Sequence, residues 1–317
     1  MIESRIAIVT TSVSAELLAG VKWDNIAEVI AGTATSPSGD HAAIKSDSTL
    51  SGVGVGLHVR YQLERDFIDL TSAPAANSAR TFPFVDFNFR YGNTTGKAHG
   101  SVDGDGFLTH IQPIKGIPGG AVPYYNATIS SRLTSYQVDA TYNMALRVSP
   151  VIDESSMNIT LGVGINYKHL NTQHSATLTL PNGIPFDKRD ISTSDNYIGP
   201  LIKLDLSTAR GPWQFAAGAY ISPTFRWTGA SIFEDFDGLY STRICDSDTG
   251  FSFNTGVYGK IGYSITDNIR IFTGANFNYH SAVSSWQIPV SPSDQPARLK
   301  RSSSWSAGIN FGLEFRF

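Results

Sequence analysis

Two His-Ser dipeptides are the places in this sequence where a general base and a nucleophile stand side by side. They are His174-Ser175 and His280-Ser281. A serine hydrolase needs its imidazole within hydrogen-bond reach of the hydroxyl. Successive side chains of a strand point to opposite faces, so neither dipeptide can supply both groups as it stands. We interpret both as polar residues at loop edges.

Acidic residues gather in two further places, where they offer the oxygen ligands that a calcium ion accepts. One is Asp103-Gly-Asp105, and the other is formed by Glu234, Asp235 and Asp237. Neither has the spacing of a complete EF-hand loop. We interpret them as solvated acidic turns, and we predict no metal site and no cofactor.

Composition limits the class of protein. The chain has 317 residues and no run approaching about 18 consecutive apolar residues, which excludes a helical membrane protein. A net charge of −3 gives no reason to expect a nucleic-acid partner. Cys245 is the single cysteine, so no internal disulfide bond can form. Residues 2–12 lack the pattern of a secretory signal, and we expect that a signal has been removed.

Residues 303–317 follow a strict period of two. Apolar side chains occupy every second position from Trp305 to Phe317, and small, polar or charged residues stand between them. The polar face needs an enclosed wet interior, and aromatic residues lie at both ends of the apolar face. This pattern predicts a strand of a transmembrane β-barrel. The aromatic ending resembles the closing strand of bacterial outer-membrane proteins, which implies recognition by their assembly machinery.

The same alternation predicts eight more strands, at residues 50–63, 81–93, 129–148, 157–170, 197–206, 213–227, 251–265 and 269–279. Residues 15–31 fit either a helix capped by Ser14 or a strand that alternates through Leu17, Ala19, Val21 and Trp23. We favour a strand, because the next strand needs a neighbour. The total is then about ten.

The predicted fold is an all-β, antiparallel, up-and-down transmembrane barrel with short periplasmic turns and long extracellular loops, since short and long connections mostly alternate. Residues 15–317 form one barrel domain, and residues 1–14 form a periplasmic segment. Several strands exceed the roughly ten residues that a bilayer requires, so we expect the barrel to project above the membrane. Pro200 and Pro223 are expected to mark bulges or the ends of the embedded parts.

Sorting by parity places nine basic and four acidic side chains in the lumen. They are Arg60, Asp86, Arg90, Asp139, Arg147, Lys168, Lys203, Asp205, Arg226, Lys260, Arg270, Glu314 and Arg316. Paired charges that fill a narrow barrel are one interpretation. A narrow pore whose basic lining favours anions is the other. We expect the aromatic residues Trp213, Trp227, Trp305 and Phe317 to anchor the barrel in the membrane.

Chain length and strand number resemble the omptin surface proteases, which use a close pair of aspartates and an Asp-His pair near the outer rim. Two Asp-x-Asp pairs, Asp103-Gly-Asp105 and Asp246-Ser-Asp248, fall in predicted loops, and no Asp-x-His occurs. No omptin catalytic residue is matched, so we predict that the protein is not an enzyme.

The excess of basic lumen residues favours a narrow, porin-like channel for small polar or anionic solutes in the bacterial outer membrane. The alternative is a non-conducting adhesin or receptor that acts through its extracellular loops, similar to ten-stranded outer-membrane adhesins. A third interpretation places residues 14–31 as a helix in the lumen and resembles autotransporter translocators. Expected partners are outer-membrane lipid and lipopolysaccharide, and a small solute or extracellular ligand. Divalent cations that bridge the acidic loop residues to lipopolysaccharide are the alternative to solvated acidic turns.

Overall fold

The computed structural model describes residues 12–35, 41–63, 83–107, 121–148, 157–289 and 295–317. Within these ranges no helix is long and apolar enough to cross a membrane. The strands are β1 (Val13–Asn25), β2 (Ile30–Thr35), β3 (His41–Lys45), β4 (Thr49–Gln62), β5 (Phe84–Phe107), β6 (Ala121–Val148), β7 (Met157–Thr179), β8 (Pro185–Arg210), β9 (Trp213–Phe236), β10 (Tyr240–Ser264), β11 (Ile269–Gln287) and β12 (Arg298–Arg316).

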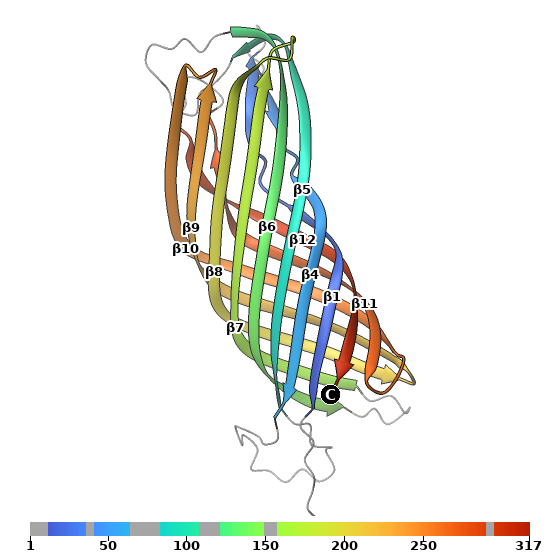
Figure 1. The fold of residues 1–317 in the computed structure, drawn as a ribbon. Helices are drawn as coiled ribbons and strands as arrows, with labels where there is room; N and C mark the ends of the chain where they lie inside the picture. Colours follow the sequence, from blue (N-terminus) through green and yellow to red (C-terminus); the bar gives the residue numbers. More distant parts are fainter. Residues whose placement is uncertain (1–11, 36–40, 64–82, 108–120, 149–156, 290–294) are drawn as a thin grey trace, which may run out of the picture.

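Ten of these strands form one closed antiparallel barrel. β4 to β12 pair in sequence order, and β1 pairs with both β4 and β12 to close the ring (Figure 1). β2 and β3 form a separate hairpin. The predicted fold class is confirmed, and the ambiguous first segment is a strand.

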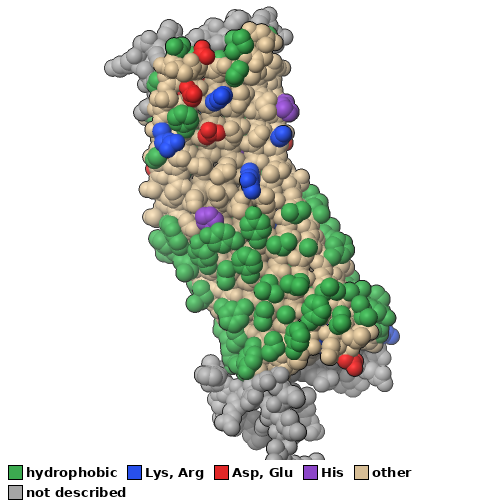
Figure 2. Space-filling model, viewed as in Figure 1, with side chains coloured by type: hydrophobic (Ala, Val, Ile, Leu, Met, Phe, Trp, Pro, Cys, Tyr) green, Lys and Arg blue, Asp and Glu red, His purple; other side chains and the backbone are tan. Residues whose placement is uncertain are grey.

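In the lower half of the barrel, apolar side chains face outward and small or polar side chains face the lumen. On β4, Val53, Val55 and Leu57 are exposed, while the glycines between them face inward. Exposed apolar side chains gather over this half (Figure 2). Such a belt is typical of a surface in contact with lipid.

Above this belt the architecture changes. The six strands β5 to β10 are 23 to 28 residues long, whereas β1 and β4 have only 13 and 14 residues. β4 pairs with β5 only as far as Ser51 and Thr95, and β11 pairs with β10 only as far as His280 and Asn254. The six long strands therefore continue upward as a curved sheet, the upper half of the molecule (Figure 1).

The polarity of the strands reverses in the upper half. Its inner face carries buried Ile129, Leu178 and Ile232, while its outer face exposes polar side chains such as Arg132 and Gln173. The β2–β3 hairpin covers part of the inner face, where Ile44 packs against Tyr125, Ala127, Ile129, Ala176, Leu178 and Phe186. This half is built like a soluble protein.

The top of the β11–β12 hairpin folds into the space inside the upper sheet. Its register shifts between His280 and Val283. Beyond this shift, the Tyr197 hydroxyl of β8 donates to the Ala282 carbonyl at 2.9 Å, and the Trp286 indole donates to the Ser192 carbonyl at 3.4 Å. The hairpin therefore crosses toward β8 instead of continuing the ring.

An apolar layer crosses the lumen where the two halves meet. It is formed by Ile26, Leu50, Leu133, Leu170, Tyr197 and Val283, all nearly fully buried and in one packed cluster. Four of these residues come from the barrel wall and the other two from the inserted segments. The wall and the inserts thus meet in one packed cluster between the lower lumen and the upper half.

Two sequence-based expectations need correction, one about the long loops and one about two prolines. Residues 94–126, 171–196 and 228–250 were predicted as long loops, but their described parts are largely strand, joined by short turns at residues 181–184 and 237–239. The error arose because the alternation continues there with its polarity reversed. Gly238 adopts a φ of 64°, as the tight turn requires. Pro200 and Pro223 interrupt the β8–β9 pairing without a register shift, so neither marks a bulge.

The predicted periplasmic segment lies outside the described residues as far as position 11. Ser12 precedes β1, which begins at Val13. The division into a segment and one barrel domain otherwise stays a prediction.

Candidate functional site

The lower lumen holds a polar pocket with a cavity volume of about 270 Å³. Ring strands from all sides of the barrel line it. The apolar layer lies directly above, because Leu133 and Leu170 each lie one inward position above a lining residue, Ser135 on β6 and Lys168 on β7. At the lower end the side chains of Arg60 and Arg316 are 40% and 47% exposed. The pocket therefore opens downward.

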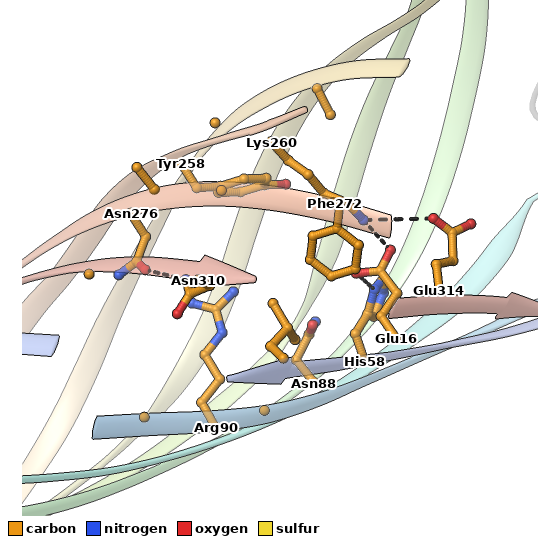
Figure 3. Close-up of a pocket in the computed structure, with 18 of the residues that line it drawn as sticks. Glu16, His58, Asn88, Arg90, Tyr258, Lys260, Phe272, Asn276, Asn310 and Glu314 are labelled. Atoms are coloured by element: carbon orange, nitrogen blue, oxygen red, sulfur yellow. Dashed lines mark hydrogen bonds and ion pairs between the residues drawn. The ribbon is translucent and has the colours of Figure 1, made fainter. Parts of the chain in front are cut away.

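One wall of the pocket carries a chain of alternating charges. His58 lies between two carboxylates, with Nδ1 3.3 Å from Glu16 and Nε2 3.2 Å from Asp86. Arg60 Nε donates to Asp86 at 2.9 Å, and Lys260 reaches Glu16 from β10, three strands away from β1 in the ring. Figure 3 shows Lys260, Glu16, His58 and Glu314 pointing toward one another. These contacts tie β1, β4, β5 and β10 together.

The lower rim is paired in the same way. Lys203 Nζ lies 2.8 Å from Asp205, and Arg270 and Arg316 approach Glu314 at 2.8 and 3.0 Å. Most of the basic lining that the alternation predicted is therefore neutralised.

The upper part of the pocket is less evenly balanced. Lys22 is 2.9 Å from Asp24, but Lys168 contacts the imidazole of His280 instead of a carboxylate. Asp139 accepts amide hydrogen bonds from Gln137 at 3.1 and 3.0 Å, and a further one from Asn166. These neutral donors occupy both oxygens of that carboxylate.

The structure places the predicted lumen residues as follows. Arg60, Arg90, Lys168, Lys203, Lys260, Arg270, Glu314 and Arg316 line the pocket, and Asp205 lies with them. Asp86 and Asp139 are buried in the wall. The side chain of Arg147 lies outside the described residues. Arg226 is buried above the pocket.

The sequence interpretation missed Glu16, Lys22 and Asp24, which all come from the ambiguous first strand. Two carboxylates and one lysine lower the predicted basic surplus by one charge. It falls further because Arg226 lies above the pocket and the side chain of Arg147 lies outside the described residues. The signal was present, since Leu17, Ala19, Val21 and Trp23 alternate with the three charged positions.

Arg226 is the centre of a second, buried network in which polar side chains hold β8, β9, β10 and β11 together. Its guanidinium lies 3.3 Å from Asp195, bonds Asp248, and donates to Thr228 at 2.9 Å. On the outer side, Arg301 Nε is 2.8 Å from Asp248. Hydrogen bonds from Arg301 and Arg226 hold the pKa of Asp248 well below its usual range.

Both histidines of the His-Ser dipeptides were predicted at loop edges, and both predictions are wrong. His174 and His280 are 5% and 2% exposed, because each points into the molecule from a long strand. His174 Nδ1 lies 2.8 Å from Ser131 Oγ, a partner from the neighbouring strand. Burial lowers the pKa of His174 to about 4, which makes it a weak base at neutral pH.

The acidic cluster at residues 234–237 is not a solvated turn throughout. Glu234 is fully buried, and its carboxylate lies 2.7 Å from Arg189, which also binds Asp187 at 2.9 Å. Among the residues that the structure describes, no group of three His, Cys, Asp or Glu side chains could hold a metal ion. The side chains of Asp103 and Asp105 lie outside those residues.

The predicted aromatic anchors lie at the two borders of the exposed apolar belt. Trp213, Trp227 and Phe317 are exposed, and Trp213 packs edge-on against Tyr263 with ring centroids 4.9 Å apart. Trp305 stacks on Phe277 with centroids 6.0 Å apart. Their anchoring role stays a prediction.

Comparison with known proteins found no matching family model and no matching curated protein. Among solved structures, the chain is similar to the outer membrane protease OmpT from Escherichia coli, with 9% identity, a TM-score of 0.48 and coverage of 97% of this chain and 96% of that one. It is also similar to a major outer membrane protein from Thermus thermophilus, with 11% identity, a TM-score of 0.32 and coverage of 98% of this chain and 100% of that one. A third similar structure is Ail, the attachment invasion locus protein of Yersinia pestis, in complex with the heparin analogue sucrose octasulfate. It has 11% identity, a TM-score of 0.26 and coverage of 96% of this chain and 99% of that one. At such identities the likeness concerns the fold alone.

Proposed function

We propose that the protein is an integral outer-membrane barrel with a closed lumen, which acts at the cell surface through its upper half and has no enzymatic activity. The apolar layer carries this proposal. Six packed apolar side chains exclude water from the path of any solute, and hydrophobic constrictions of this kind block conduction.

The exposed apolar belt supports the membrane position. Water-exposed apolar patches of this extent are rare in soluble proteins, whereas lipid-facing strands require them. The upper half has a polar outside and an apolar inside, as expected for a part surrounded by water. It is therefore the part available to a partner outside the cell.

Charge pairing in the lower lumen also favours a closed barrel. Ion pairs between strands that are not neighbours in the ring, such as Lys260 of β10 with Glu16 of β1, hold separate parts of the wall together. Such links fill a narrow barrel with its own side chains.

The anion channel expected from the sequence remains the second candidate. It is favoured by Arg90, which lines the pocket and forms no ion pair with any described residue.

Planar-bilayer conductance of the refolded protein separates these two functions. We expect no discrete current steps from the wild type across many insertions, and we expect steps when Leu133→Gly is combined with Leu170→Gly to open the apolar layer. Wild-type steps with anion preference, weakened by Arg90→Glu, would instead establish the channel.

Cys245 tests the orientation. It is the single cysteine, and it is exposed on the upper part of β10. A membrane-impermeant maleimide should label it on intact cells, and Cys245→Ser should abolish the labelling. Labelling only after cell lysis would contradict a surface-exposed upper half.

A further inference from the structure

Arg90 differs from the other basic residues of the pocket. Eight basic side chains line the lower lumen within the described part of the chain, and six of them have a carboxylate within 4 Å. Lys168 is buried against His280. The guanidinium of Arg90 has neither a carboxylate nor a hydrogen-bonding partner among the residues described. It is the one strong donor in the pocket, as far as the structure describes the chain, whose capacity is unused.

The surroundings of Arg90 leave space for a ligand. It pairs in register with Gly56 on one side and Gln137 on the other, and Gly92 is the next inward residue of its own strand. A side chain at Gly56 would touch Arg90 Cγ, at 3.7 Å. Figure 3 shows the Arg90 side chain extending toward Asn310 and Asn276, which are hydrogen-bonded to each other at 2.9 Å. The guanidinium is thus framed by glycines and side-chain amides.

A carboxylate on the neighbouring strand β6 does not compensate Arg90. Asp139 stands opposite Asn88, one inward position below, and its oxygens are taken by the amides of Gln137 and Asn166. Neutral amides thus satisfy an acid that could otherwise have bound the arginine. An arginine that served only to fill the barrel would be expected to pair as its neighbours do, since an ionic hydrogen bond is stronger than a neutral one.

We propose that the pocket binds a small oxyanion, the carboxylate or phosphate group of a polar molecule, which enters from the lower end and is held by Arg90. A guanidinium matches both groups through two parallel hydrogen bonds. The side-chain amides of Asn276 and Asn310 offer further donors. Eight basic residues against the six acidic ones at Glu16, Asp24, Asp86, Asp139, Asp205 and Glu314 leave the lumen with a positive balance that an anion neutralises.

The size of the ligand is limited by the cavity. The cavity volume of about 270 Å³ lies just below the roughly 300–1,000 Å³ of typical small-molecule pockets. A small molecule therefore fits, whereas a long oligosaccharide or peptide does not. This inference does not depend on conduction, because a pocket closed at the top can bind a ligand and release it on the same side.

Isothermal titration of the full-length protein in detergent micelles tests the proposal, with inorganic phosphate and succinate as separate probes at constant ionic strength. We expect saturable one-to-one binding of at least one probe, and the stronger probe identifies the preferred group. Arg90→Gln should weaken this binding about ten- to hundredfold, the range for loss of a charge-assisted pair. Arg301→Gln, which removes the same charge from the upper half, should leave it unchanged.

Arg90→Lys keeps the charge but loses the two-pronged geometry, and it should bind more weakly than the wild type and more tightly than Arg90→Gln. If Arg90→Gln does not fold, the comparison of Arg90→Lys with the wild type tests the role of Arg90 in binding. Equal binding by the wild type and Arg90→Gln, or no saturable binding of either probe at millimolar concentration, would overturn the proposal. Neither result bears on the apolar layer, whose test is conductance.

Discussion

The lower and upper halves of this molecule share the long strands but place their apolar side chains on opposite faces. On β6, the lower half turns Val138 outward and keeps Asp139 inside, whereas the upper half buries Ile129 and exposes Arg132. The parity of inward and outward positions is the same throughout. What changes is the medium on each side, with lipid outside and water inside below, and water outside and packed protein inside above.

The difference teaches that alternation fixes the faces of a strand but not their polarity. A transmembrane strand and a half-buried soluble strand both have a period of two. The transition lies at the apolar layer and at the Arg226 network, where charged side chains become fully buried between strands. Substitutions placed on either side of that border should therefore have different consequences.

Arg226→Ala should lower the free energy of unfolding most, because Arg226 lies in the buried network between the two halves. It leaves Asp195, which is 1% exposed, without its cation. Loss of one partner of a buried ion pair costs about 3–5 kcal/mol in the free energy of unfolding. Urea unfolding of the refolded wild type and variant measures this loss of stability.

The matched control is the double variant with Arg226→Leu and Asp195→Leu, which removes both charges. It should be less destabilised than Arg226→Ala. If both variants lose the same stability, the network does not depend on charge compensation.

A pair of arginine substitutions on one strand tests the two outer media directly. Val163 and Gln173 both face outward on β7, the first in the apolar belt and the second in the upper half. Val163→Arg should lower the free energy of unfolding by about 2–4 kcal/mol, because a cation at the lipid face is poorly solvated. Gln173→Arg should change the unfolding free energy by less than about 0.5 kcal/mol. Equal effects in lipid vesicles would refute the assigned border.

Acidification should weaken the upper half through His174. Its folded-state pKa of about 4 lies below the usual value of 6.5, so the unfolded state binds more protons between these values. Stability from this group is complete above pH 6.5 and is lost as the pH falls toward 4. Between pH 7 and pH 5 the loss is about 2 kcal/mol. His174→Gln should lose correspondingly less over the same range, and identical losses would show that His174 does not carry this effect.

Arg301→Ala should have the smallest effect. Its side chain is 51% exposed, and its partner Asp248 keeps the contact with Arg226. Exposed ion pairs contribute about 0–1 kcal/mol. A larger loss in urea unfolding would mean that Arg301 belongs to the buried border after all.

The sequence allowed the lower half to be predicted well, because lipid and water impose a strong contrast on neighbouring residues. The closing strand, the inward position of Arg60 and Asp86 and the ring of ten strands all follow from that contrast. The first strand was harder, since Ala19 and Gly20 carry little hydrophobic signal. Leaving it open removed Glu16 and Asp24 from the charge balance.

The upper half was not predictable by the same argument. The upper part of β8 resembles a polar loop in sequence, because its outer face is polar and its buried inner face also carries the charged side chains of Asp187, Arg189 and Asp195. The apolar layer was missed for another reason. Its residues come from β4, β6, β7 and β8 and from segments that leave the ring. Because they are far apart in the sequence, no local spacing indicates that they meet.

The seam between β1 and β12 has a consequence for how the chain folds. Twelve register pairs join the first ring strand to the last, and the Ser304 hydroxyl reaches the Asn25 carbonyl across 279 positions of sequence. Contacts this distant carry the largest loop-closure entropy in the molecule, so they are favourable only when the intervening hairpins already hold the ends together. Closure of the ring is then the final cooperative step, and the contact of Glu16 with Lys260 can form only when it has taken place.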